Sequence, residues 1–187
     1  MRIIAGTHRG THMAELGAGD EAAHLRPTSD RVRESLFNVL QGGRYGDPLR
    51  GTRVLDLFAG TGALGLEALS RGAAHVTFVD NGRVAQGLIR ANIAKLRRQD
   101  DTKLITTSVT ALPTGQPCDL VFLDPPYGLS LGQAALEAAL GQGCIAADAL
   151  IVWEEARAQM APAGFAVADQ RRYGETWVTL LRSTQAG

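Results

Sequence analysis

Residues 124–127 place a carboxylate, two prolines and an aromatic ring directly after the apolar run of residues 120–123. Proline cannot donate a hydrogen bond to a sheet, and it drives the residue before it toward extended backbone, so we predict a strand that ends there. A carboxylate, rigid backbone and an aromatic ring at one strand end suit chemistry on a planar amine. Such a segment also fits a plain strand and turn. The predicted catalytic residues are Asp124, Pro125, Pro126 and Tyr127.

A second motif begins at Asp56, where an apolar run leads into a glycine turn and then a helix. Glycines let a backbone approach a ligand closely, and helix amides add partial positive charge. Gly60, Gly62 and Gly65, with Asp80 further on, also fit the pattern of dinucleotide-binding sites. Asp56 separates the two interpretations, because a carboxylate at the turn would repel a pyrophosphate but would suit a cationic ligand.

S-adenosylmethionine is such a ligand, since it carries an ammonium group and a sulfonium and no phosphate. We expect Asp56 to hold its methionine portion, the glycine turn to give it room, and Asp80 to accept hydrogen bonds from its ribose. The alternatives are structural: Asp56 would cap the turn, and Asp80 would cap the following helix. No metal is expected, and the product would be S-adenosylhomocysteine. The predicted cofactor site comprises Asp56, Phe58, Gly60, Gly62, Asp80, Asn81, Ser108 and Val109, with the last two near the adenine.

Seven short apolar runs predict strands. The first five have room for a helix between most of them, which predicts a parallel sheet covered by helices on both faces. Only a polar turn separates the last two, which predicts a terminal antiparallel hairpin. The runs cover residues 54–58, 76–79, 104–107, 120–123, 150–153, 165–168 and 176–181.

Three helices accompany these strands. The clearest follows Asp80, where apolar residues recur at helical spacing, and the others span about residues 63–71 and 30–40. Near the start of the chain, residues 2–5 read as a short strand. By composition, residues 6–24 are the segment with the least order.

The 187 residues suffice for one domain with a substantial core, and 45% hydrophobic and 20% charged residues are ordinary for a globular protein. The 19 basic and 19 acidic residues cancel, so net charge neither requires nor excludes a nucleic-acid partner. Cys118 and Cys144 lack metal-ligand spacing and fit a reducing compartment. No segment resembles a signal peptide or a transmembrane span, so we expect a cytoplasmic protein without a membrane partner.

In an open parallel sheet, ligands bind beyond the carboxyl ends of the strands, and Asp56, Asp80 and Asp124 all fall at such ends. A methyl donor beside the Asp124 turn suggests transfer to the exocyclic amine of a nucleobase. The carboxylate and the Pro125 carbonyl would accept the two amine hydrogens, and Tyr127 would stack on the base. A base inside a helix is out of reach, so the target must be extruded or unpaired.

Three further segments carry a family resemblance: residues 26–38, 2–6 and 173–176. With both motifs in place, the chain resembles the bacterial RsmD family of class I S-adenosylmethionine-dependent methyltransferases. The resemblance implies an α/β Rossmann-like fold, with a seven-stranded mostly parallel sheet, helices on both faces and a terminal antiparallel hairpin. It also implies an N-terminal extension, residues 1–50, for RNA contact, and a catalytic domain, residues 51–187.

The activity that the resemblance implies is methylation of the N2 amine of one guanine in 16S ribosomal RNA, within a partly or fully assembled 30S subunit. We expect the enzyme to be a monomer. Arg26, Arg31 and Arg33 are expected to contact RNA phosphate or the cofactor side, since arginine can bind phosphate bidentately and stack on bases. The alternative is a solvated helix start that pairs locally with Asp30 and Glu34. The predicted RNA contacts are Arg26, Thr28, Arg31, Arg33, His8 and Arg9.

Three other functions stay open at this point. The Asp124 turn alone does not name the base, so a DNA or other RNA amino-methyltransferase acting on adenine or cytosine is possible. The glycine pattern with Asp80 also fits a nicotinamide-binding regulator. An RNA-binding assembly protein with an idle cofactor site is the third alternative, and the intact Asp124 and Tyr127 argue against it.

Overall fold

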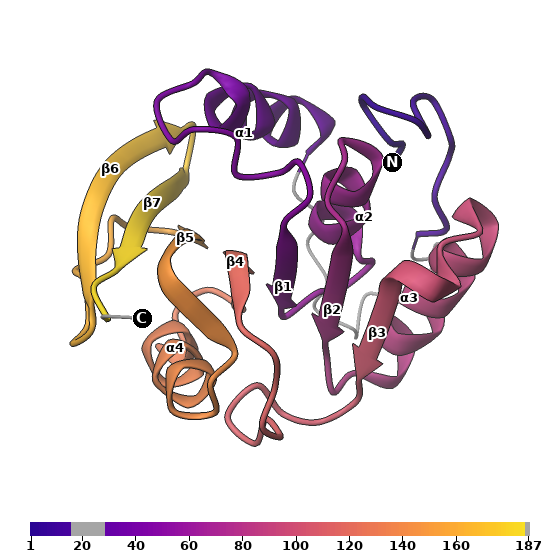
Figure 1. Ribbon diagram of the computed structural model, residues 1–187. Coiled ribbons are helices and arrows are strands. Elements are labelled where there is room, and N and C mark those ends of the chain that lie inside the picture. Colours follow the sequence, from indigo (N-terminus) through magenta and orange to yellow (C-terminus); the bar gives the residue numbers. More distant parts are fainter. Residues whose placement is uncertain (16–28, 186–187) are drawn as a thin grey trace.

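Seven strands form one sheet in the computed structural model, which describes residues 1–15 and 29–185 (Figure 1). The strand order is β3-β2-β1-β4-β5-β7-β6. From β3 to β5 all neighbours are parallel, whereas β7 runs antiparallel to both β5 and β6. The strands are β1 (Arg53–Leu57), β2 (His75–Val79), β3 (Thr102–Ile105), β4 (Cys118–Leu123), β5 (Ile145–Glu155), β6 (Phe165–Tyr173) and β7 (Thr176–Ser183).

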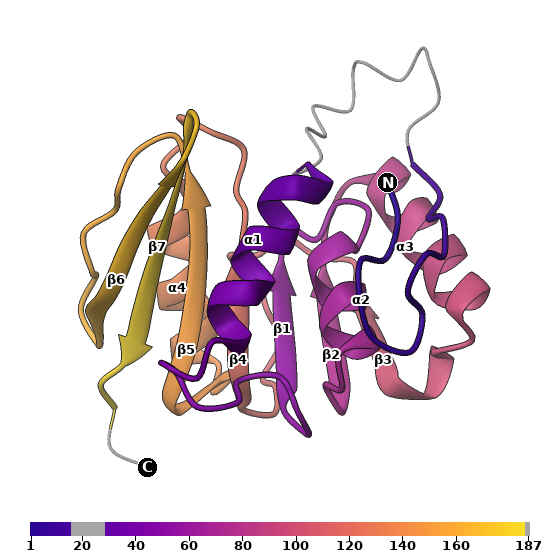
Figure 2. The ribbon, with the colours of Figure 1, turned by 90° about the horizontal axis from the view of Figure 1, so that it is seen from above.

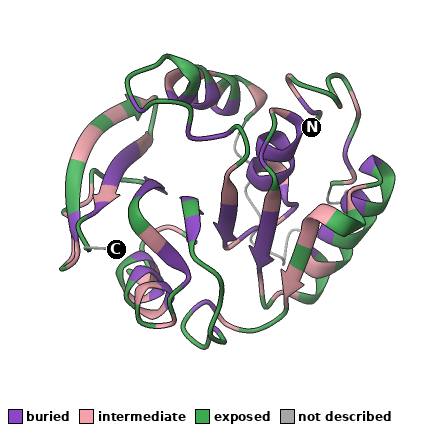
Figure 3. Cartoon of the chain, viewed as in Figure 1, coloured by how far each residue is buried: buried purple, intermediate pink, exposed green. Residues whose placement is uncertain are grey.

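Helices cover both faces of this sheet, as the alternating pattern predicts (Figure 2). Residues of α1, α2 and α3 share one core with Val54, Leu120 and Phe122, whereas α4 shares a second core with Val121 and Leu123. Alternate residues of each strand thus supply the two cores. Buried residues accordingly concentrate in the strands and on the inner sides of the helices (Figure 3). The helices are α1 (Asp30–Gln41), α2 (Ala63–Ser70), α3 (Arg83–Leu96) and α4 (Leu131–Gly141), with a short 3₁₀ helix η2 (Gln99–Asp101).

The seven predicted strands of the sheet, the three predicted helices and the terminal hairpin are all present, and the strand positions differ most at the far end of the sheet. β5 and β6 extend well beyond the predicted residues 150–153 and 165–168. The first half of β5 is partly exposed, and its register with β4 shifts between Cys118 and Leu120. An irregular, solvated strand start lacks the apolar run on which the prediction depended.

The N-terminal segment packs against α2 and α3, although its composition suggests little order. The buried Glu67 carboxylate accepts hydrogen bonds from the backbone amides of Ile4 (2.8 Å) and Ala5 (3.0 Å). Further along, the Asn92 side chain both donates to and accepts from the backbone of Ala14. The prediction of low order was therefore wrong for residues 6–15, and the rest of that segment lies outside the described residues.

The predicted short strand at residues 2–5 is reduced to one antiparallel bridge between Arg2 and His12. Residues of this segment and of α1, among them Ile3, Phe37 and Leu40, belong to the same core as the sheet. The division into an extension and a catalytic domain near residue 50 stays a prediction. Across the described chain, none of the helices has both the length and the apolar character needed to cross a membrane.

Candidate active site

Four acidic residues lie at the carboxyl edge of the sheet, where the strand order reverses. β1 lies between β2 and β4. Val54, Phe78 and Phe122 are buried on the side of the sheet that α1, α2 and α3 cover. Because side chains alternate along a strand, the acid two residues after each of them faces the same side. We call these four residues the acidic edge: Asp56 on β1, Asp80 after β2, Asp124 after β4 and Glu154 on β5.

Asp56 is the most deeply buried of the three predicted aspartates, with 2% of its surface exposed. Its carboxylate accepts a hydrogen bond from the backbone amide of Gly65, in the first turn of α2, at 2.9 Å. The pKa of Asp56 is raised to about 8, mainly by burial and also by the nearby negative charge of Asp80, against the lowering effect of the Gly65 bond. The bond to Gly65 fits the alternative in which Asp56 caps the turn. The raised pKa also means that the carboxyl would ionise more readily beside a cation.

The glycine turn that follows β1 has the backbone geometry of a close-approach loop. Phe58, Gly60 and Gly62 have φ values of 60°, 57° and 79°, the left-handed region that glycine adopts without strain. Gly65 is constrained by packing instead, because a Cβ there would lie 2.4 Å from the Phe78 ring. Gly65 thus allows α2 to pack closely on the sheet, whereas Gly60 and Gly62 allow the left-handed backbone of the turn itself.

Asp80 ties this turn to the next loop. One carboxylate oxygen accepts from the Gly60 amide at 2.9 Å, and the other accepts from the Gly82 amide at 2.8 Å. Gly82, and not Asp80, is the N-cap residue of α3. The partly buried carboxylate therefore bridges two loops at the edge, which is where a ribose acid is expected, and Asn81 beside it is exposed.

The Asp124 turn continues the sheet past the end of β4. The Asp124 amide lies 3.5 Å from the Leu57 carbonyl, so the segment stays beside β1 before it turns away. Pro125 is buried and Pro126 exposed, while Asp124 and Tyr127 are partly buried. The two prolines thus fix the direction in which the carboxylate leaves the sheet.

Tyr127 is anchored through its hydroxyl group. That hydroxyl donates to Glu154 Oε1 at 3.2 Å and lies 3.2 Å from the Thr176 hydroxyl on β7. Burial raises the pKa of Tyr127, and the charges of Glu154 and Asp124 raise it further, so the phenol stays protonated. Because the hydroxyl is held by two partners, the orientation of the ring is fixed, which suits stacking on a planar group.

Sequence reasoning missed Glu154 and the role of Thr176. Glu154 follows an apolar run, the same signal that identified Asp56, Asp80 and Asp124, but β5 continues through it. Thr176 belongs to residues 173–176, one of the segments behind the family resemblance. The structure gives this segment a physical role, since it starts the strand that reaches the Asp124 turn.

The predicted adenine contacts separate. Ser108 is partly buried, and its hydroxyl bonds locally to Thr110. The side chain of Val109 is 6% exposed and packs in the core beside α4. Only the backbone of Val109 is left to line a ligand site, so adenine contact here stays a prediction.

The predicted RNA contacts also divide. Arg31, at the start of α1, and Arg9 are exposed, whereas His8 is partly buried near Arg98. Burial lowers the pKa of His8, and the positive charge of Arg98 lowers it further. Arg26 and Thr28 lie outside the described residues.

The prediction that Arg33 contacts RNA was wrong, because its side chain is fully buried. The guanidinium donates to the Arg2 carbonyl and to Asp30, and it lies 4.0 Å from Glu67. On its other side, Glu67 pairs with Arg71 at 2.7 Å. We call Arg33, Glu67 and Arg71 the paired cluster, and it joins α1, α2 and the N-terminal segment.

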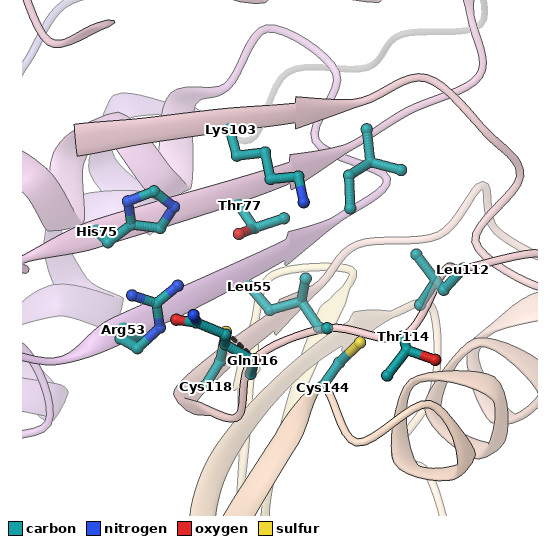
Figure 4. Close-up of a pocket in the computed structure, with 12 residues that line it drawn as sticks. Arg53, Leu55, His75, Thr77, Lys103, Leu112, Thr114, Gln116, Cys118 and Cys144 are labelled. Carbon is teal, nitrogen blue, oxygen red and sulfur yellow. Dashed lines mark hydrogen bonds between the residues drawn. The ribbon is translucent and has the colours of Figure 1, made fainter. Parts of the chain in front are cut away.

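A separate pocket of about 490 Å³ lies on the α4 side of the sheet, where a loop, and no helix, connects β3 to β4 (Figure 4). Arg53, His75 and Lys103 line it from three adjacent strands. Arg53 and His75 stand at the amino ends of β1 and β2, opposite the acidic edge. None of the residues predicted for the cofactor or the base lines this pocket.

Comparison with known proteins identifies the family. The chain matches the family model described as Conserved hypothetical protein 95 over residues 1–182. It is 38% identical over 156 residues to the Escherichia coli (strain K12) protein named Ribosomal RNA small subunit methyltransferase D, an overlap of 82% of this chain and 74% of the relative. The chain belongs to this RsmD family of methyltransferases. The resemblance drawn from its motifs is thereby confirmed.

Solved structures give the same result for the RsmD-family fold. The Escherichia coli protein yhhF superposes with a TM-score of 0.83 at 32% identity, over 100% of this chain and 99% of that one. A ribosomal protein L11 methylase from Lactobacillus delbrueckii subsp. bulgaricus, at 16% identity and a TM-score of 0.66 over 86% of this chain and 82% of that one, shares the fold alone. The predicted class I methyltransferase fold is confirmed.

Proposed function

We propose that this enzyme transfers a methyl group from S-adenosylmethionine to the N2 amine of a guanine in 16S ribosomal RNA. The observation that carries the proposal is the acidic edge, which sets the Asp124 turn beside the glycine turn at the point where the strand order reverses. The name of the Escherichia coli relative supports ribosomal RNA of the small subunit as the substrate.

The residues of the glycine turn fit S-adenosylmethionine better than a dinucleotide. The Asp56 carboxyl is buried with a pKa of about 8, and Asp80 lies close enough to raise that pKa. A pyrophosphate would add two more negative charges beside these acids. An ammonium group would instead stabilise the ionised carboxylate, so Asp56 would face the methionine end and Asp80 the ribose.

Bound S-adenosylmethionine supplies a methyl carbon activated by its sulfonium. The Asp124 carboxylate and the Pro125 carbonyl would accept the two N–H bonds of the target amine and direct its lone pair out of the ring plane. As the new N–C bond forms and the C–S bond breaks, Asp124 also stabilises the positive charge that develops on nitrogen. The proton is lost afterwards, when the charged amine has become acidic, so no strongly basic group is required.

Most of the rate gain would come from alignment. Holding two reactants in the reactive geometry can lower a barrier by roughly 7–11 kcal/mol. Tyr127, anchored by Glu154 and Thr176, would stack on the base and fix its plane. The base must leave its helix to reach this position.

The RNA contacts that we propose are the exposed Arg31 and Arg9, together with His8 and with Arg26 and Thr28. Arg31 and Arg9 are accessible for phosphate binding. Presentation of the target within a partly or fully assembled 30S subunit, the monomeric state and a cytoplasmic location stay predictions.

The decisive experiment incubates the enzyme and labelled S-adenosylmethionine with deproteinised 16S RNA and with 30S particles, followed by nucleoside mass analysis. We expect N2-methylguanosine as the labelled product. Label in adenosine or cytidine, or none in either RNA, would contradict the proposal. Asp124→Ala is expected to bind the cofactor normally and to lose at least about 1,000-fold in single-turnover rate; near-normal methylation by this variant would remove Asp124 from the mechanism.

A further inference from the structure

Glu154 occupies the position across from Asp124 on the neighbouring strand. β4 and β5 are parallel with Leu123 paired to Trp153, so the next step along both strands places Asp124 opposite Glu154. Phe122 and Val152, two residues earlier, both face the core beside α1, and the alternation of side chains carries the two acids to that same side. Adjacent strands lie roughly 4.8 Å apart, a separation that two carboxylates can span around one small planar group.

The hydroxyl of Tyr127 links the Asp124 turn to Glu154. Glu154 accepts its hydrogen bond at 3.2 Å, and the charges of both Glu154 and Asp124 act on the phenol. Glu154 is 5% exposed, so it lies at the base of the Asp124 turn and not at its rim.

The hydrogen-bonding groups of the bases differ in a way that an acid at this position could distinguish. In guanine, the exocyclic amine lies between two ring nitrogens, N3 with a lone pair and N1 with a hydrogen, so N1 and N2 are both donors on one edge. In adenine and cytosine, the ring nitrogen next to the amine is a lone-pair acceptor. A second carboxylate beside Asp124 would therefore bind the guanine edge and repel the corresponding edge of the other two bases.

We infer that Glu154 accepts a hydrogen bond from N1–H of the target guanine and so selects guanine over adenine and cytosine. This inference rests on the proposed methyl transfer to a base amine and adds the residue that chooses the base. When the guanine enters, one Glu154 oxygen accepts from N1–H while Tyr127 stacks on the ring. Glu154 then acts on the substrate directly, in addition to holding Tyr127.

The test replaces the target guanine, once mapped, with 2-aminopurine, which keeps the C2 amine but has a lone pair at N1. Single-turnover rates at subsaturating RNA are measured for both substrates with wild-type enzyme and with Glu154→Gln. Wild type is expected to favour guanine by about 10- to 100-fold, and Glu154→Gln to reduce that ratio at least about 10-fold. Comparing ratios cancels the intrinsic difference in amine reactivity.

Glu155→Gln is the matched control. Glu155 is the next residue, is similarly buried at 7% exposure, and points to the opposite side of β5, where its carboxylate accepts from the Ala156 amide. It should keep the wild-type ratio. Tyr127→Phe separates direct from indirect action, because it removes the hydroxyl and leaves Glu154 in place. It should slow both substrates alike and preserve the ratio.

The outcomes distinguish this inference from the proposed function. If wild type methylates guanine and 2-aminopurine RNA equally, or if Glu154→Gln keeps the wild-type ratio, the inference is overturned while methylation of guanine stands. A Tyr127→Phe enzyme with the lowered ratio would also overturn it, since Glu154 would then act only through the ring. Should Glu154→Gln fail to fold, the ratios of wild type and Tyr127→Phe decide. No methylation of guanine RNA by wild type would instead refute the proposed function.

Discussion

The paired cluster and the acidic edge both bury charge, but they satisfy it in opposite ways. In the paired cluster, the Glu67 carboxylate lies between two guanidinium groups and accepts two backbone amides. In the acidic edge, carboxylates gather together: Asp56 and Asp80 accept from backbone amides, and Glu154 accepts from a phenol. The first arrangement pairs its carboxylate with cations of the fold, whereas in the second the pKa of the buried Asp56 is raised by burial and by the neighbouring Asp80.

The difference shows how a structural cluster can be told from a site. A balanced group has its electrostatic interactions within the fold, so it holds elements together. An acid whose pKa is raised by burial and by a neighbouring carboxylate is stabilised in its ionised form by a positive charge from outside, which here would be a sulfonium, an ammonium or an amine that is being methylated.

Breaking the paired cluster should cost the most stability. Glu67→Ala would leave the fully buried Arg33 with Asp30 as its remaining carboxylate partner and the amides of Ile4 and Ala5 without an acceptor. We expect a loss of about 3–5 kcal/mol in the free energy of unfolding, measured by urea denaturation near pH 7. Glu34→Ala, on the exposed side of α1, is the control and should change it by under about 0.5 kcal/mol. A loss below about 1 kcal/mol for Glu67→Ala would contradict the structural role.

Asp56→Asn should affect ligand binding more than folding. Asparagine keeps an oxygen that can accept from the Gly65 amide but removes the negative charge. We expect S-adenosylmethionine to bind about 10- to 100-fold more weakly by isothermal titration, with no loss of stability. Asp119→Asn, which replaces an exposed acid bonded to the Arg53 amide, should leave the affinity unchanged. Unchanged binding by Asp56→Asn would make Asp56 a cap only.

The pH dependence of stability should report the same residue. With a folded pKa of about 8 and an unfolded pKa near 4, Asp56 holds a proton in the native state that the unfolded chain has released between these values. Its contribution to the free energy of unfolding is therefore full below about pH 4 and falls as the pH rises toward 8. Asp56→Asn should gain stability relative to wild type across this range in urea titrations. A constant difference between the two proteins would show that Asp56 is ionised in the native state.

The smallest expected effect concerns the exposed start of α1. Arg31→Ala should weaken RNA binding slightly and reduce the slope of log affinity against log salt by about one. Filter binding at several salt concentrations measures the slope. Arg157→Ala, an exposed arginine on the loop after β5, serves as control and should not change it. An unchanged slope for Arg31→Ala would place the phosphate contacts elsewhere.

Much of this layout could be predicted from local patterns. Apolar runs located the seven strands, and residues that end strands, Asp56, Asp80 and Asp124, were predicted to converge because parallel strands share one carboxyl edge. The acids at the ends of β4 and β5 show what such local patterns cannot predict. Asp124 is followed by proline, which marks the strand end in the sequence, whereas Glu154 lies inside a longer strand and carries no such mark.

Arg33 failed as a predicted RNA contact for a related reason. Its spacing from Leu36, Phe37 and Leu40 puts it on the buried side of α1. An arginine is buried only where polar partners are available to its guanidinium, and one of them here, Glu67, comes from a helix far away in the sequence. Long-range pairing of this kind leaves no local signal. The same holds for the N-terminal residues, whose backbone is held by Glu67 and Asn92.

The bond between Tyr127 and Thr176 has a consequence for how the enzyme matures. Thr176 starts β7, which inserts between β5 and β6 and is the last strand to be synthesised. In a nascent chain that has emerged only as far as β5, the aromatic ring still lacks one of its two anchors. The full support of that ring would thus arrive only with the final hairpin.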